Sequence, residues 1–131
     1  MNTTIKNILE NKVGIIYGNG TSKETIALYE NKIGMSFAVS YREYLEYYGI
    51  VAFWGHEITG ISRSMRTDVA NVTLNERMRN PVATENMYVI ERAGIDGIII
   101  WQSSSGEIYR TDYQSIPRKI YKNFEEYLLS I

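Results

Sequence analysis

The clearest hydrophobic pattern in the chain is helical and lies between residues 40 and 49. Four apolar side chains recur there at spacings of three and four, as one face of an amphipathic helix requires: Tyr41, Tyr44, Leu45 and Tyr48. Ser40 is placed to cap this helix, Glu43 completes a capping box, and Gly49 is a suitable terminator. The pattern therefore predicts a helix from Ser40 to Gly49.

Weaker helical patterns flank this segment. A short helix is predicted to run to about Lys12, and a second is predicted to start at a Thr21 cap and to stop at Gly34. A third, over residues 67–79, contains several β-branched and Asn residues, so it is predicted as a weak helix that Pro81 closes. The segment 62–84 has the weakest apolar pattern and is expected to be the most mobile.

Strand patterns occupy the middle of the chain. Ile50–Trp54 and Glu57–Ile61 read as two short strands separated by Gly55 and His56, with Gly60 as a possible bulge. These two strands follow the strongest helix directly, so the chain is expected to reverse at the Gly55–His56 pair.

A second group of strands is denser in β-forming residues. Met87–Ile90, Ile98–Trp101 and Glu107–Tyr113 are separated by turn signals and predict an antiparallel meander, after which Asn123 caps a closing helix over 124–131. Helices at the front and back with consecutive strands between them predict an α+β domain. We expect one domain, residues 1–131, with a mainly antiparallel sheet of about five or six strands and N- and C-terminal helices packed on it.

Composition narrows the classes of function. The 131 residues are 44% hydrophobic and 22% charged, which is typical of a globular protein, and the net charge of -1 gives no field that would draw nucleic acid or a membrane. Absence of Cys excludes disulfides and thiolate chemistry. No signal-peptide pattern and no run of about 20 apolar residues is present, so a cytoplasmic location is expected.

Candidate catalytic groups are few. His56 is the only histidine, and its place in a predicted reversal favours a turn residue rather than a general base. The segment 18–23 has glycines before a helix but lacks the spacing of a phosphate-binding loop, and an ordinary turn is the better interpretation. The carboxylate pairs, Glu43 with Glu46 and Glu125 with Glu126, lack the further ligands that a metal ion requires. No catalytic, cofactor or metal residue is assigned.

Basic residues concentrate in one segment, 62–80, which contains Arg63, Arg66, Arg77 and Arg79 against two acidic residues. This segment could bind an anion or RNA. A solvated helix face is the better interpretation, because the segment lacks the aromatic side chains that stack on bases.

Aromatic side chains offer the remaining signal, with 11 Tyr against 3 Phe. Tyr combines an apolar ring with a polar tip and therefore suits core edges and binding surfaces. Most of these rings are expected in the core, but an outward-facing Tyr47 and Trp54 would form an adhesive surface. This favours a binding protein over an enzyme.

The order of three segments resembles the SUKH superfamily of Smi/Knr-like proteins. These segments are Phe37–Gly49 with the following Glu57–Gly60, the hairpins from Tyr88 to Tyr109, and the closing Asn123–Leu128. The resemblance implies an α+β domain that is not an enzyme and that binds and neutralises a cognate toxin, often a nuclease, in the producing cell. It also implies a second possibility, a regulatory scaffold in signalling or cell-wall control.

The predicted function is therefore an immunity protein, with Tyr47, Trp54, Glu57 and Trp101 as the predicted partner-binding residues. A third hypothesis, a small enzyme or ligand-binding domain, would use His56 or the glycine turn at 18–21. The sequence leaves the toxin's identity and the oligomeric state open.

Overall fold

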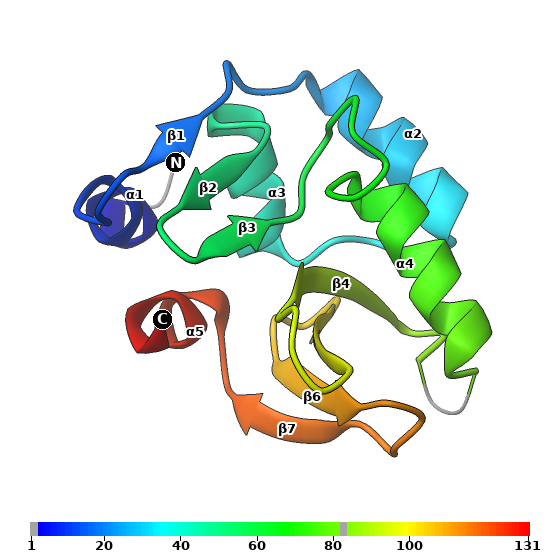
Figure 1. The fold of residues 1–131 in the computed structure, drawn as a ribbon. Helices are drawn as coiled ribbons and strands as arrows, with labels where there is room; N and C mark the ends of the chain where they lie inside the picture. The colour runs from blue at the N-terminus through cyan, green and yellow to red at the C-terminus, as the bar shows by residue number, and fades with distance from the viewer. Residues whose placement is uncertain (1–2, 82–83) are drawn as a thin grey trace.

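The computed structural model describes residues 3–81 and 84–131, and within them the chain forms five helices and seven strands (Figure 1). In chain order these are α1 Thr3–Glu10, β1 Ile16–Tyr17, α2 Lys23–Ile33, α3 Val39–Tyr47, β2 Val51–Phe53, β3 His56–Ile58, α4 Val69–Arg79, β4 Met87–Arg92, β5 Ile98–Ser103, β6 Ile108–Asp112, β7 Arg118–Tyr121 and α5 Phe124–Ser130. The predicted α+β class is confirmed.

The strands form two antiparallel sheets, in the orders β1-β2-β3 and β4-β5-β6-β7. The predicted sheet of about five or six strands is thus corrected to seven strands in two sheets. The sequence patterns missed β1, which has two residues between glycine-rich turns, and β7, which has four residues after Pro117. Strands this short carry too few alternating positions to stand out from loops.

One backbone hydrogen bond links the two sheets where β3 ends. The N–H of Thr59 donates to the carbonyl of Ile90 in β4 at 2.8 Å. The register of β4 against β5 shifts between Val89 and Glu91, so the chain bulges at this contact. The bulge turns the β4 backbone toward Thr59, and the two sheets meet there without continuous strand pairing.

Helices flank the sheets in pairs. Figure 1 shows α2 and α4 side by side on one flank and α1 beside α5 on the other, near both chain ends. Lys12, just after α1, donates from Nζ to the main-chain oxygen of Ile131 at 2.6 Å, and so fastens the two terminal segments together. None of the helices in the described ranges is long and apolar enough to cross a membrane.

The core divides into two clusters. The larger draws apolar side chains from the helices and from both sheets, and the smaller lies between α4 and the four-stranded sheet. The buried members of the smaller cluster are Val72, Met87, Val89, Ile99 and Trp101.

Two helix starts differ from the predictions. Helix α3 begins after Ala38, which makes no side-chain capping bond, so Ser40 lies inside the helix and is not its cap. The N–H of Ala38 instead donates to the Tyr88 hydroxyl at 3.0 Å, so a tertiary contact replaces the predicted cap. Helix α2 is capped by Ser22, one residue after the predicted Thr21, whereas Gly34 closes it in the left-handed conformation as predicted.

The segment 62–84, expected to be the most mobile, contains the regular helix α4 with five buried residues. Asp68 caps this helix and accepts from the N–H of Asn71 and from the Tyr29 hydroxyl, the latter at 2.7 Å. The predicted bulge at Gly60 is also corrected, because Gly60 lies beyond β3 in an isolated bridge with Asp68. Val82 and Ala83 lie outside the described residues.

Candidate functional site

The four predicted partner-binding residues fall into two groups. Trp54 is 84% exposed on the turn between β2 and β3, Tyr47 is 44% exposed at the end of α3, and Glu57 is exposed on β3. Trp101 is fully buried on β5, where its indole N–H donates to Thr111 at 2.9 Å. The structure therefore gives Trp101 a packing role, and its inclusion among surface residues is corrected.

Trp54 and Glu57 belong to one surface on the outer face of the three-stranded sheet. Across this sheet Ile16 is paired with Ala52 and Ala52 with Glu57, so these three side chains share the outer face. The N–H of Trp54 donates to the carbonyl of Val13 at 3.0 Å, which brings the segment before β1 beside the indole. Val13 is 79% exposed and Ile16 is 71% exposed.

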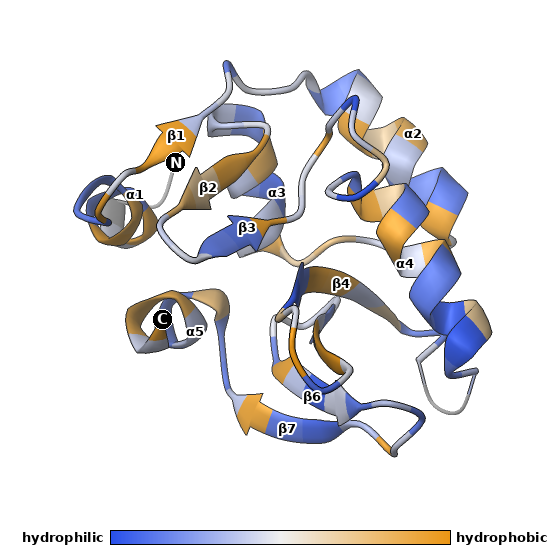
Figure 2. Cartoon of the chain, in the orientation of Figure 1, coloured by the Kyte–Doolittle hydropathy of each residue, from blue (hydrophilic) through white to orange (hydrophobic). Residues whose placement is uncertain are grey.

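We call this region, Val13, Ile16, Trp54 and Glu57, the β1 surface. Figure 2 shows the hydrophobic colour of β1 and β2 beside a hydrophilic β3. Glu57 forms an ion pair with Arg66, so the apolar residues have a charged rim on the β3 side. An apolar centre with a polar rim is the arrangement of a protein-binding surface.

Tyr47 lies in a separate group with Tyr17 and Tyr48. Its ring meets that of Tyr48 edge-on with centroids 4.8 Å apart, and Tyr17 meets Tyr48 in the same way at 5.1 Å. The ammonium of Lys6 lies 5.4 Å from the centroid of the Tyr47 ring, and its interaction with the Tyr47 hydroxyl raises the pKa of Lys6. Tyr17 faces away from the outer face of Ile16, because neighbouring strand residues alternate.

His56 lies in β3 rather than in the predicted reversal, and it is joined through Glu91 to Tyr127. Its Nδ1 is 2.8 Å from the Glu91 carboxylate, and the second oxygen of that carboxylate accepts from the Tyr127 hydroxyl. Burial, followed by the charge of Glu91, raises the pKa of Tyr127. The cluster joins β3, β4 and α5, so its evident effect is to hold these three elements together.

The glycine turn before α2 has a packing reason. A Cβ on Gly20 would lie 2.2 Å from the carbonyl oxygen of Glu46, and one on Gly18 would lie 2.8 Å from that of Tyr48. The N–H of Thr21 also donates to the Glu46 carbonyl at 3.3 Å. The turn is therefore packed against the end of α3, and its glycines permit this close approach.

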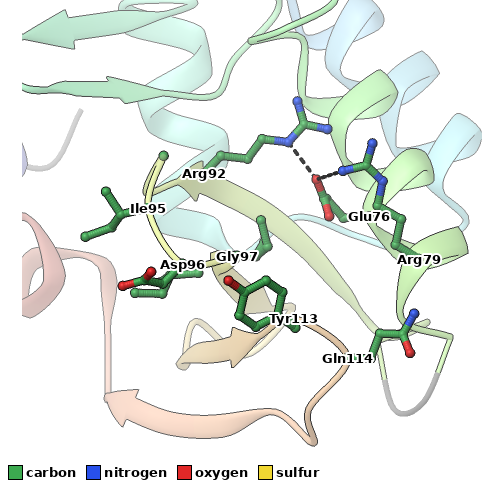
Figure 3. Close-up of a pocket in the computed structure, with 11 residues that line it drawn as sticks. Glu76, Arg79, Arg92, Ile95, Asp96, Gly97, Tyr113 and Gln114 are labelled. Carbon is green, nitrogen blue, oxygen red and sulfur yellow. Dashed lines mark hydrogen bonds and ion pairs between the residues drawn. The ribbon is translucent and has the colours of Figure 1, made fainter.

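A pocket of about 670 Å³ lies between the end of α4, the β4–β5 turn and the end of β6. Figure 3 shows the Glu76 carboxylate between two guanidinium groups from different elements. Oε2 of Glu76 lies 2.7 Å from Nε of Arg92 and 3.8 Å from Nη1 of Arg79. Ile95 and Tyr113 form an exposed apolar rim.

Sequence reasoning missed this pocket, since its residues come from three segments that share no motif. Two features of the sequence lie in or near the pocket: the arginines of segment 62–80 and the Asp-Gly turn at 96–97. The four arginines do not form one patch. Arg66 pairs with Glu57, the guanidinium of Arg77 donates to the carbonyls of Ile33 and Met87, and Arg79 lines the pocket. Burial lowers the pKa of Arg77, which fits its structural use.

Comparison with known proteins places the chain in a family. No curated protein matches it. The family model SUKH_5, described as SMI1-KNR4 cell-wall, matches residues 1–131. The match confirms the likeness to the SUKH superfamily that three ordered packing patterns had indicated. The chain therefore belongs to the SUKH_5 family of the SUKH superfamily.

Proposed function

We propose that this protein is a non-enzymatic immunity protein that binds a cognate toxin domain and neutralises it in the cytoplasm of the producing cell. The observation that carries the proposal is the β1 surface, where an 84% exposed Trp54 stands beside Val13 and Ile16. Trp is enriched among residues that dominate binding energy, and a contiguous apolar surface on a folded chain is a typical partner site.

Binding would stop the toxin by occlusion, so the immunity protein needs affinity and shape but no reaction centre. Its net charge of -1 offers little long-range attraction for a basic toxin. Affinity would come from burying the indole of Trp54 and the side chains of Val13 and Ile16, with the Glu57–Arg66 pair at the rim of the contact. A nuclease is one class of toxin that fits the proposal.

The family description supports a second candidate, a regulatory scaffold in signalling or cell-wall control. It would use the same surface on a housekeeping partner. The two functions differ in the identity of the partner and in whether the protein protects a cell. They do not differ in the chemistry of the β1 surface.

The deciding experiment coexpresses the protein with the product of the adjacent reading frame and measures copurification and cell survival. We expect a stable complex and protection from toxicity. Trp54→Ala should weaken the complex by about 30-fold or more, as truncation of a binding hot spot does. Leu28→Ala is the matched control, because Leu28 is an exposed apolar residue on α2, outside the β1 surface.

Two outcomes would contradict the proposal. If the neighbouring product is not toxic, or if coexpression protects no cell from it, the immunity function is wrong. A stable complex with a housekeeping protein, lost in Trp54→Ala and kept in Leu28→Ala, would favour the regulatory scaffold instead.

A further inference from the structure

We propose that the pocket between α4, the β4–β5 turn and β6 is a second binding site, one that takes an acidic peptide segment of a protein partner. A carboxylate of that segment would bind Arg79 and Arg92, and a neighbouring apolar side chain would cover Ile95 and Tyr113. The inference deepens the proposed function, because it rests on that function for a protein partner and names the chemistry of a second contact.

The pocket has two acidic and two basic side chains, so an anionic group would be held by unused guanidinium donors and not by a net positive charge. Glu76 is buried, and its carboxylate is already satisfied by the close contact from Arg92 at 2.7 Å. Arg79 lies farther away, at 3.8 Å, and its side chain is 74% exposed. A guanidinium carries five N–H donors, so both arginines keep donors that Glu76 does not use. Their forks suit bidentate binding of a carboxylate.

The remaining acidic residue does not oppose this assignment. Figure 3 places the Asp96 carboxylate on the opposite side of the pocket from Arg79. Gln114 lies on the Arg79 side, where its amide can add a further hydrogen bond.

The shape of the site favours a peptide over an enclosed small molecule. Its volume of about 670 Å³ would hold several side chains. However, the rim residues Ile95 and Tyr113 are 64% and 69% exposed, so the pocket is open to solvent at its rim. Small ligands are usually more than about 70% buried in their sites. An open pocket with an apolar rim instead suits a peptide segment of a protein, because the rest of that protein can cover the rim.

The backbone of the pocket is strained. In residues 3–81 and 84–131 positive φ occurs at two residues other than glycine, Asp96 at 49° and Tyr113 at 56°, and both line the pocket. The Tyr113 ring packs on Gly97, where a Cβ would lie 2.6 Å from Cδ1 of the ring. The Tyr113 N–H donates to the Gly97 carbonyl at 3.0 Å. Such left-handed residues persist where the surroundings enforce them, and they recur at ligand-binding sites.

The test is a titration of the ¹⁵N-labelled full chain, followed by NMR, with two blocked tripeptides, Asp-Phe-Asp and its uncharged counterpart Asn-Phe-Asn. We expect the acidic peptide to shift the amide signals of Gly94, Gly97 and Tyr113 in a saturable way. The expected dissociation constant is on the order of 1 mM. R79Q should weaken binding by about tenfold, whereas R63Q, an equal loss of charge at an exposed residue outside the pocket, should leave it unchanged.

Four results would overturn the proposal: no saturable shift, equal binding of the uncharged peptide, equal weakening by R63Q, or, in a parallel titration with phenylacetate, stronger binding of phenylacetate than of the acidic peptide. The last would assign the pocket to a small carboxylate. The titration uses the purified chain alone. A negative titration with intact cell protection would therefore reject the pocket and leave the proposed function standing. Saturable peptide binding without cell protection would support the pocket and reject the immunity function.

Discussion

The hydroxyl of Tyr44 donates a 2.9 Å hydrogen bond to the main-chain carbonyl of Thr59, at the point where the two sheets meet. Tyr41 donates to the same carbonyl at 3.0 Å, and the Thr59 hydroxyl donates to the carbonyl of Val89 at 2.7 Å. All three side chains are buried, so the strands leave polar backbone groups in the interior that these hydroxyls satisfy. The excess of Tyr over Phe thus has a structural use in the core.

Removing these two hydroxyls should cost more together than separately. Tyr41→Phe and Tyr44→Phe each leave the Thr59 carbonyl with one donor, so each should lower the free energy of unfolding by about 1 kcal/mol. The double variant strips the buried carbonyl of both donors and should lose about 1 kcal/mol beyond the sum. Urea denaturation of the four proteins measures this coupling. Additive losses would show that the shared carbonyl is satisfied in another way.

The two tryptophans should respond oppositely to truncation. Trp101→Ala removes a fully buried indole from the smaller core cluster and leaves Thr111 without its donor, so it should cost about 3–5 kcal/mol of stability. Trp54→Ala removes an exposed side chain and should change stability by about 0.5 kcal/mol or less. Thermal unfolding monitored by circular dichroism tests both. A large loss in Trp54→Ala would assign that residue to folding and remove it from the proposed interface.

Stability should fall steeply at alkaline pH. Burial, aided by Asp68, raises the pKa of Tyr29 to about 12, and burial raises the pKa values of Tyr41, Tyr44 and Tyr88 well above 10. Above pH 10 the unfolded chain loses these protons while the folded chain keeps them. The stabilisation is therefore complete below about pH 10 and declines as the pH rises from about 10 toward 12.

Urea denaturation between about pH 8 and 11, with tyrosinate absorbance as a second signal, measures this decline. The buried tyrosines should ionise together with unfolding. Tyr29→Phe should show a shallower decline than the native protein. Ionisation of all 11 tyrosines before any loss of secondary structure would contradict the assignment.

Features that depend on residues close in sequence were predicted, whereas features that depend on contacts between distant residues were not. Local signals placed the helices well, since the Gly34 stop and the Asn123 cap depend on neighbouring residues alone. The predicted Ser40 cap failed because Ala38 bonds to Tyr88, 50 residues away, and sequence spacing carries no trace of such a contact.

The candidate sites show the same limit. For Trp54 and Tyr47 the sequence allowed either a core position or an outward one. For Trp101 an apolar sequence pattern could not distinguish a buried side chain from an exposed one. The pocket required Arg79, Arg92 and Tyr113 to meet from three segments. A single sequence does not predict how those segments pack.

Gly60 should accept a side chain poorly for steric reasons alone, because its φ is not positive. It lies where the end of α3, the exit of β3 and the start of α4 meet: its N–H donates to the Thr67 carbonyl at 3.0 Å, and its carbonyl accepts from Val69 at 2.7 Å. A Cβ there would lie 2.1 Å from the carbonyl oxygen of Gly49, so two backbone segments would have to separate. Gly60→Ala should therefore cost about 3 kcal/mol.

Gly55 provides the matched comparison. It has a φ of 81°, but no atom lies within 4 Å of the position that a Cβ would take. Gly55→Ala therefore meets only the strain of the left-handed backbone, about 1 kcal/mol. Chemical denaturation of both variants separates steric exclusion from backbone strain. Equal losses would mean that the contact with Gly49 yields easily. Because Gly55 lies in the turn that carries Trp54, its variant also tests whether partner binding depends on the shape of that turn.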